Sequence, residues 1–254
     1  MPINSSLTIP GAGPFYFEGN KIGILLIHGG GGGTCSDLKP LAKDLHMIGG
    51  YTISVPLLPG YGTTPDELRK IRIDDWKSAL KKEFLGLLNR CEKIIVGGHS
   101  MGGILTLLLA SNYNANCIFL INAPVGIQRF LFHLVPLFKI FVKYHAINSE
   151  QFRKDTNGNW VGYDKIPLNI AIKMKKLMKE MKRSLLNISC PTLIFQGRRD
   201  SEIKANSMDY IFSNIKSKTK RKIWLENNGH PILKSPDHNQ IVLEVVKFIN
   251  EFCT

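Results

Sequence analysis

Ser100 lies in a glycine-rich segment with the spacing of a catalytic nucleophile. The pattern Gly98-x-Ser100-x-Gly102 follows the apolar run 93–97, which is typical of a buried strand, and precedes an apolar helical pattern that begins at Met101. Between a strand and a helix, this pattern predicts a sharp turn that exposes the serine hydroxyl. Such a turn leaves no room for side chains at its flanks, which explains the two glycines. A glycine-rich turn with a solvated serine is the alternative.

His230 is the residue best placed in the sequence to activate this serine. A serine hydroxyl is a weak nucleophile, so it needs a base, and the base needs a carboxylate that orients it. In folds with this turn, the three residues follow in the order serine, acid, histidine. His230 follows the last apolar run, whereas His238 lies in the C-terminal helical pattern, where a surface position is expected.

Asp200 is the predicted acid. It ends the segment Gly197-Arg198-Arg199-Asp200, directly after the apolar run 192–196. Glu202 and Asp209 are weaker candidates because they run into the next helical pattern. A buried structural aspartate or a capped turn is the alternative for Asp200. The three residues together predict acyl-transfer chemistry.

A run of five glycines, 29–33, follows His28 and an apolar run. Acyl transfer creates a negatively charged oxygen, and losing one preorganised N–H that faces it costs about 3–4 kcal/mol. We expect the two donors of this oxyanion hole to be the amides of Met101 and Gly30. A phosphate-binding loop is disfavoured, because no Gly-Lys-Ser/Thr follows and Thr34 stands where a dinucleotide fingerprint needs its third glycine. His28 is expected to brace the loop by hydrogen bonding.

Short apolar runs alternate with longer helical patterns along most of the chain. This alternation predicts an α/β fold with a mostly parallel central sheet flanked by helices. Continuous apolar runs suit strands that are buried on both faces. Strands are expected at 22–27, 51–56, 93–97, 117–121, 192–196 and 222–225, with an edge strand at 15–17. Helices are expected to start at Thr34 and Thr64 and to cover 73–88, 101–112, 203–215 and 239–252.

The alternation stops between residues 125 and 189. We therefore expect an α/β core made of 1–124 and 190–254, and a helical cap, 125–189, inserted over one end of the sheet. The cap contains a strongly apolar segment and an amphipathic helical pattern, 168–186. The methionines of that pattern suit either ordinary core packing or an adaptable apolar pocket.

Six short motifs follow one another along the chain: His28-Gly29-Gly30, Pro59-Gly60-Tyr61-Gly62, Asp75-Trp76, Gly98-His99-Ser100-Met101-Gly102-Gly103, Gly197-Arg198-Arg199-Asp200 and Gly229-His230. This ordered set resembles the serine α/β-hydrolases, most of all bacterial carboxylesterases and monoacylglycerol lipases. The resemblance extends from about residue 22 to 252 and is weakest in the cap. It implies the α/β-hydrolase fold, with Ser100 acylated, His230 as the base and Asp200 orienting it. The chain departs from these families in its five glycines, where relatives often carry a bulky residue after His-Gly.

The leading hypothesis is hydrolysis of a carboxylic ester with an apolar acyl chain, for example a monoglyceride. Gly29, His99, Phe130 and Phe138 are expected to contact the substrate. A thioesterase or an acyltransferase would use the same triad. A binding protein that retains a hydrolase fold is the alternative class, since fold does not fix function. No cofactor or metal is expected.

The composition favours a globular protein with an excess of positive charge. Of the 254 residues, 44% are hydrophobic and 21% are charged, which excludes a disordered chain. The net charge is +13, and eight of these charges lie within residues 125–190. A lysine-rich solvated surface explains them, and a transient contact of the cap with anionic lipid is the alternative. Nucleic-acid binding is not expected because no recognition motif is present. We expect a monomer or a weak dimer.

Five scattered cysteines contain no CxxC pair, so they predict neither a zinc cluster nor a disulfide framework. The first twenty residues lack the pattern of a signal peptide. The most apolar stretch is shorter than the roughly 18 residues that a membrane span needs. These features predict a reduced, cytoplasmic protein.

Overall fold

A computed structural model describes residues 9–128, 143–156, 158–232 and 235–253. Seven strands of these segments form one sheet, in the order β1-β3-β2-β4-β5-β8-β9. Strand β1 runs antiparallel to β3, and all other neighbours are parallel. The prediction of a mostly parallel sheet is therefore confirmed, and the edge strand expected at 15–17 is present and runs antiparallel. The strands are β1 (Phe15–Phe17), β2 (Ile22–Ile27), β3 (Thr52–Val55), β4 (Lys93–His99), β5 (Cys117–Ile121), β8 (Thr192–Gly197) and β9 (Lys220–Leu225).

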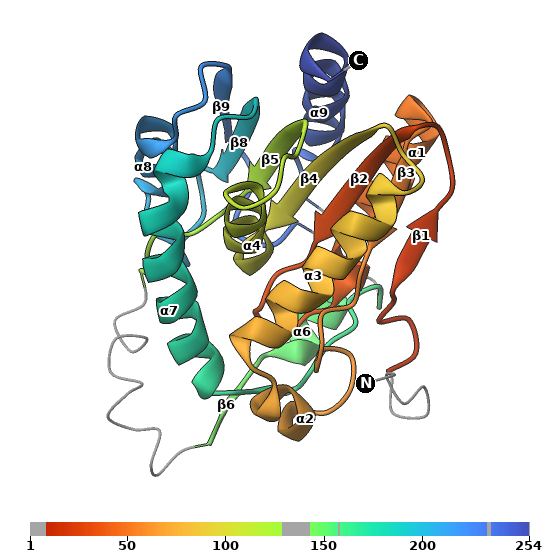
Figure 1. Ribbon diagram of the computed structural model, residues 1–254. Coiled ribbons are helices and arrows are strands. Elements are labelled where there is room, and N and C mark those ends of the chain that lie inside the picture. The colour runs from red at the N-terminus through yellow and green to blue at the C-terminus, as the bar shows by residue number, and fades with distance from the viewer. Residues whose placement is uncertain (1–8, 129–142, 157, 233–234, 254) are drawn as a thin grey trace.

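The helices cover both faces of the sheet, which is why the central strands are apolar throughout. In Figure 1, α3, α4 and α7 lie on the near face, and α1 and α9 lie on the far face. Every residue of β5 is buried, as expected for a strand covered on both sides. The helices of the core are α1 (Lys39–Gly49), α2 (Pro65–Lys70), α3 (Ile73–Leu88), α4 (Met101–Ala110), α8 (Ser207–Asn214) and α9 (His238–Phe252), with a 3-10 turn η2 (Cys35–Leu38).

Two helix starts follow the capping residues expected from the sequence. At the start of η2, the Thr34 hydroxyl accepts the amide N–H of Ser36 at 3.4 Å. The Thr64 hydroxyl accepts the amide N–H of Glu67 at 3.2 Å, and Pro65 takes the first helical position. Helix α8 begins later than expected, at Ser207. The residues that precede Ser207 do not join the helix. Two of their backbone amides, those of Glu202 and Ile203, donate to the Asp200 carboxylate instead.

The segment expected to be a helical cap also contains strands. Strands β6 (Tyr144–Ala146) and β7 (Lys165–Pro167) form a separate antiparallel pair. Each has three residues, which is too short for an alternating pattern, so they could not be predicted from the sequence. Helix α6 (Ser149–Asp155) lies between them, and α7 (Asn169–Ser184) and a 3-10 turn η3 (Leu185–Asn187) follow.

Helix α7 packs its apolar side against the core helix α4. Met174, Leu177, Met178 and Met181 are all buried. Polar contacts add to this packing, since Lys173 Nζ donates to the carbonyl of Leu68 at 3.2 Å. The methionine stripe therefore packs in the core.

The expectation of reduced cysteines without a disulfide framework is wrong for two of the five. Cys117, at the start of β5, forms a disulfide with Cys253, which follows α9. The two residues are 136 positions apart in the chain, so their spacing in the sequence carried no signal. Their Cα atoms are 6.6 Å apart because the end of α9 returns to this end of the sheet. Among the described residues, no helix is long and apolar enough to cross a membrane.

Candidate active site

The predicted site residues meet at one edge of the sheet. Ser100 follows β4, Asp200 follows β8, and His230 follows β9. The glycine loop follows β2, which is the neighbour of β4. Because these strands are parallel, their carboxyl ends lie side by side. This edge is therefore where residues distant in sequence come together.

Ser100 occupies the sharp turn between β4 and α4. Its φ of 54° and ψ of −118° are unusual for a residue with a side chain, and such strain costs of order 1–3 kcal/mol. The turn also requires its glycines. A Cβ at Gly98 would lie 2.3 Å from the Gly102 carbonyl oxygen, and one at Gly102 would lie 1.9 Å from the Ile27 oxygen. The strained turn holds the Ser100 side chain clear of the helix.

Ser100, His230 and Asp200 form a continuous chain of hydrogen bonds. His230 Nε2 lies 2.9 Å from Ser100 Oγ, and His230 Nδ1 lies 2.7 Å from Asp200 Oδ2. An ionised carboxylate can only accept, so Nδ1 carries the proton and donates it to Asp200. Nε2 is then free to accept from the serine hydroxyl.

Asp200 is held as an ion although its side chain is buried. Burial acts to raise its pKa, but the hydrogen bond and charge of His230 lower it. The amides of Glu202 and Ile203 also donate to Oδ1, at 2.9 and 3.3 Å. The donors outweigh the burial, and the pKa of Asp200 lies below its usual value.

The weaker candidates for the acid and the base lie elsewhere or farther away. Glu202 Oε2 is 4.0 Å from His230 Nε2, on the side of the imidazole that faces Ser100. Asp209 forms an ion pair with Lys222. His238 Nε2 is hydrogen-bonded to Asp44 Oδ2 at 2.7 Å, between α9 and α1. None of the three orients His230 through Nδ1.

His28 braces the glycine loop, as the sequence predicted. Its Nδ1 lies 2.8 Å from the Gly29 oxygen, and its Nε2 accepts the Leu58 amide at 3.2 Å. These partners require the proton on Nδ1. Burial lowers the pKa of His28 to about 4, so the imidazole is neutral at pH 7.

The amides expected to form an oxyanion hole lie next to Ser100. A Cβ built on Gly29 would be 3.4 Å from Ser100 Cβ, and one built on Gly30 would be 2.7 Å from Met101 Sδ. Within the described segments, neither the Gly30 nor the Met101 amide donates to a protein acceptor. Both amides therefore lack a protein acceptor among the described residues.

His99 and Asn122 hold the loop that carries His230. His99 Nε2 donates to the His230 carbonyl at 2.8 Å, and Asn122 Nδ2 donates to the same carbonyl at 3.0 Å. Asn122 also accepts the Gly197 amide at 2.7 Å, which ties this loop to the strand before Asp200. Sequence reasoning missed Asn122. Its position directly after the strand 117–121 was the available signal.

Two of the residues expected to contact substrate, Phe130 and Phe138, lie outside the described residues. The other two, Gly29 and His99, lie beside Ser100. Across the parts of the chain that are described, no cluster of three or more His, Cys, Asp or Glu side chains could hold a metal ion.

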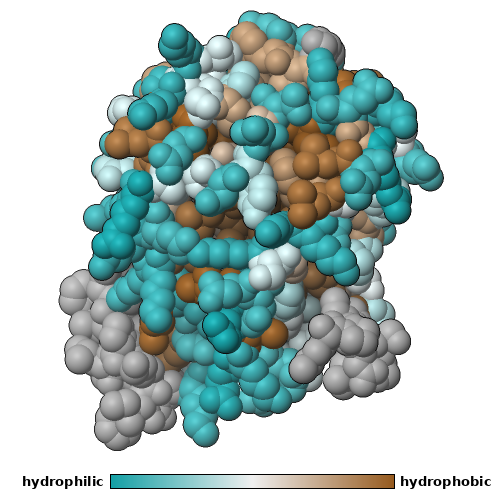
Figure 2. All heavy atoms as spheres, in the orientation of Figure 1, coloured by the Kyte–Doolittle hydropathy of each residue, from teal (hydrophilic) through white to brown (hydrophobic). Residues whose placement is uncertain are grey.

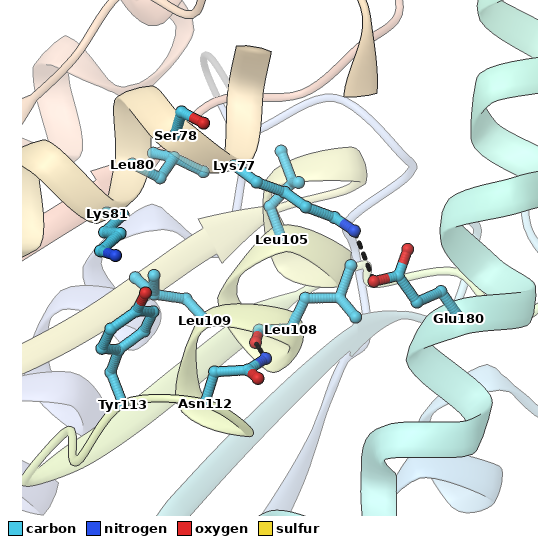
Figure 3. Close-up of a pocket in the computed structure, with 10 residues that line it drawn as sticks. All are labelled: Lys77, Ser78, Leu80, Lys81, Leu105, Leu108, Leu109, Asn112, Tyr113 and Glu180. Atoms are coloured by element: carbon cyan, nitrogen blue, oxygen red, sulfur yellow. Dashed lines mark hydrogen bonds and ion pairs between the residues drawn. The ribbon is translucent and has the colours of Figure 1, made fainter. Parts of the chain in front are cut away.

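A cavity of about 290 Å³ lies away from this edge, between α3, α4 and α7. Leu105 and Leu108 line it, and Lys77 forms an ion pair with Glu180 on α7 (Figure 3). Ser100, Asp200 and His230 do not line it. It is therefore separate from the candidate active site.

The serine aminopeptidase S33 family matches residues 20–237. The chain belongs to this family of α/β-hydrolases. The resemblance to serine α/β-hydrolases is thereby confirmed, and with it the fold. The family name describes a peptidase, whereas two similar proteins of known name are a lipase and an esterase.

Two curated relatives span nearly the whole chain. A thermostable monoacylglycerol lipase of Bacillus sp. (strain H-257) is 32% identical over 241 residues, which is 94% of this chain and 95% of that protein. A carboxylesterase of Bacillus subtilis (strain 168) is 26% identical and covers 94% of this chain and 96% of its own length. A solved structure from work on the metagenome-derived lipolytic enzymes LipS and LipT superposes with a TM-score of 0.87 at 26% identity, over 96% of this chain and 99% of that one. The chain is an α/β-hydrolase of the esterase and lipase type.

Proposed function

We propose that the protein hydrolyses carboxylic esters through an acyl-enzyme on Ser100. The observation that carries this proposal is the chain of hydrogen bonds from Ser100 through His230 to Asp200. Ser100 Oγ attacks the acyl carbon, and its proton moves to His230 Nε2. The ester C–O bond breaks, and the alcohol leaves with that proton. Asp200 orients the imidazole and stabilises its charge without taking the proton.

The second half of the reaction returns the enzyme to its starting state. A water molecule gives a proton to His230 Nε2 and attacks the acyl carbon. The bond between the acyl carbon and Ser100 Oγ breaks, and Ser100 recovers the proton from His230. In both halves, the amides of Gly30 and Met101 would stabilise the negative oxygen. These roles need no cofactor.

The proposed substrate is an ester with an apolar acyl chain, such as a monoacylglycerol. The relatives support this class, since one is a monoacylglycerol lipase and another a carboxylesterase. We propose that residues 125–189 act as the cap of this site and that 1–124 and 190–254 form the core. The contacts of Gly32 and Gly33 with Tyr163 and Gly162 support this division, because they bring the segment next to the glycine loop.

The test is hydrolysis of p-nitrophenyl esters of increasing chain length by the wild type and Ser100→Ala. We expect turnover by the wild type, no turnover by Ser100→Ala, and a chain-length optimum that measures the acyl pocket. Equal activity in both proteins would reject Ser100 as the nucleophile. A folded but inactive wild type would redirect the proposal to a thioester, an acyl transfer or a binding role.

A contact with anionic lipid is proposed as an additional property of the cap. The outward side of α7 carries exposed Lys176, Lys179 and Arg183, and hydrophilic side chains gather over α7 in Figure 2. We expect the wild type to sediment with phosphatidylglycerol vesicles at low salt. A smaller fraction of the Lys176→Glu/Lys179→Glu variant should sediment with them. The matched control is Lys43→Glu/Lys247→Glu, which makes the same charge change on α1 and α9. Vesicle binding that does not change with the salt concentration or with the charge of the lipid would rule out this contact.

A further inference from the structure

The five-glycine loop has no side chains of its own to hold its shape. Glycine samples more backbone conformations than any other residue, so a run of five is expected to be loose. An oxyanion hole works only if its N–H groups already face the reacting oxygen. Something outside the loop must therefore fix the peptides of Gly29 and Gly30.

Two buried aromatic rings hold successive carbonyls of this loop. His28 Nδ1 donates to the Gly29 oxygen at 2.8 Å, and the Tyr61 hydroxyl donates to the Gly30 oxygen at 3.2 Å. A peptide unit is planar, so holding the Gly29 oxygen also directs the Gly30 N–H. Holding the Gly30 oxygen fixes the next plane. Together the two bonds restrain the peptide planes on both sides of Gly30.

We propose that Tyr61 is a positioning residue of the oxyanion hole, which holds the Gly30 carbonyl so that the Gly30 N–H stays directed at the oxyanion. This inference rests on the proposed function and adds a role for the Pro59-Gly60-Tyr61-Gly62 motif. Tyr61 does not touch the reacting atoms and acts only through the glycine loop.

The surroundings of Tyr61 fit a rigid support. Its side chain is 1% exposed, and its ring meets the His28 ring edge to face with centroids 4.9 Å apart. Trp76 packs against the other side at 6.0 Å, and its Nε1 donates to the Pro59 carbonyl at 2.9 Å. Burial raises the pKa of Tyr61, so the hydroxyl keeps its proton and remains a donor. The motif is therefore anchored on both sides of Tyr61.

The neighbouring Tyr163 provides a matched control. Its hydroxyl donates to the Gly60 carbonyl at 2.6 Å and accepts the Thr63 amide at 3.0 Å. It thus supports the same motif as Tyr61 and is also buried, but its hydroxyl does not bond the Gly30 carbonyl. Tyr163→Phe removes hydroxyl bonds from the motif and leaves the bond between Tyr61 and Gly30 in place.

The experiment compares Tyr61→Phe and Tyr163→Phe with the wild type on the best p-nitrophenyl ester. For Tyr61→Phe we expect kcat to fall by about tenfold or more with KM within twofold, because the oxyanion exists only after binding. Affinity for an alkyl boronic acid, which forms a tetrahedral adduct with a catalytic serine, should fall in parallel. For Tyr163→Phe, kcat, KM and the boronate affinity should each stay within about threefold of the wild-type value. Wild-type kcat and boronate affinity in Tyr61→Phe, or equal losses in both variants, would overturn the proposal.

Two further measurements separate positioning from misfolding and from a wrong substrate. Gly31→Ala added to Tyr61→Phe should restore part of the lost kcat, because alanine restricts the backbone conformations of the loop. Among the described residues other than its two chain neighbours, no atom lies within 4 Å of a Cβ built on Gly31. Because Gly31→Ala can also stabilise the whole fold, kcat is compared at a temperature where urea unfolding shows both variants to be fully folded. Hydrogen exchange of the amides of 29–33 should be faster in Tyr61→Phe than in Tyr163→Phe. If the wild type hydrolyses no ester, the proposed function fails, and this exchange still decides whether Tyr61 holds the loop.

Discussion

The side-chain amide of Asn122 donates to the main-chain carbonyl of His230 at 3.0 Å. It also donates to the Gly229 carbonyl at 3.0 Å and accepts the Gly197 amide. Asn122 therefore connects the loop of the proposed base to the strand that leads to the proposed acid. Its φ of 51° shows that the backbone is strained to place this side chain.

Asn122→Asp should lower activity while the protein stays folded. The substitution keeps the shape and the acceptor for Gly197, but it removes both donors and adds a charge. The His230 loop is then free to shift, and small displacements of a catalytic group cost up to about 100-fold in rate. We expect kcat to fall by 10- to 100-fold on p-nitrophenyl esters. Asn112→Asp, at the far end of α4, is the matched control, and equal kcat in the two variants would reject the positioning role of Asn122.

Asp200→Asn tests the orienting carboxylate separately from the nucleophile. The amide can donate to His230 Nδ1 and thereby favour the tautomer that has its proton on Nε2, which cannot accept from Ser100. In triads of this kind the change lowers kcat by about 10⁴. The measurement is kcat for the variant beside Asp209→Asn, whose carboxylate pairs with Lys222. If Asp200→Asn keeps more than a tenth of the activity, another acid, with Glu202 the first candidate, must orient the histidine.

The sequence was sufficient for the parts of the site that follow from local geometry. The glycines at 98 and 102 are required by backbone contacts within one turn, so the motif alone predicted the elbow. Asp200 and His230 followed from chain order and from the ends of apolar runs. The central strands were predictable because burial on both faces makes them continuously apolar.

The parts that the sequence did not predict depend on contacts between distant segments. Asn122 bonds residues more than 70 positions away, and Tyr61 reaches Gly30 across 31 positions. Their roles come from how neighbouring strand ends and loops meet. The pairing of Cys117 with Cys253 has the same origin. Apart from the position of Asn122 directly after a strand, the sequence contains no local signal for these contacts.

Two buried histidines should make the protein sensitive to acid. Burial lowers the pKa of His28 to about 4 and that of His99 to about 3, from about 6.5. Between pH 6.5 and 4 the unfolded chain therefore binds protons that the folded protein does not, and stability falls as the pH falls.

His99→Gln should weaken this pH dependence. Glutamine can still donate to the His230 carbonyl but does not titrate. The slope of the free energy of unfolding against pH should therefore decrease by about 1.4 kcal/mol per pH unit, which corresponds to one proton fewer taken up on unfolding. Urea unfolding at pH 6.5, 5.5 and 4.5 measures it, with exposed His145→Gln as the control. An unchanged slope would mean that His99 is protonated in the folded state.

Asp37 should act in the opposite direction, because burial raises its pKa to about 7. Its Oδ1 is buried without a hydrogen-bond partner among the described residues. Its Oδ2 packs closely against Gly33, since a Cβ built on that glycine would lie only 2.2 Å from it. The fold favours the protonated carboxyl, so stability decreases as the pH rises from about 4 through about 7. Asp37→Asn cannot ionise and should be more stable than the wild type at pH 8, with a smaller difference at pH 5. Urea unfolding at both pH values, beside exposed Asp74→Asn, makes the comparison. A difference that is the same at pH 5 and pH 8 would show that Asp37 is already ionised in the folded protein at pH 5.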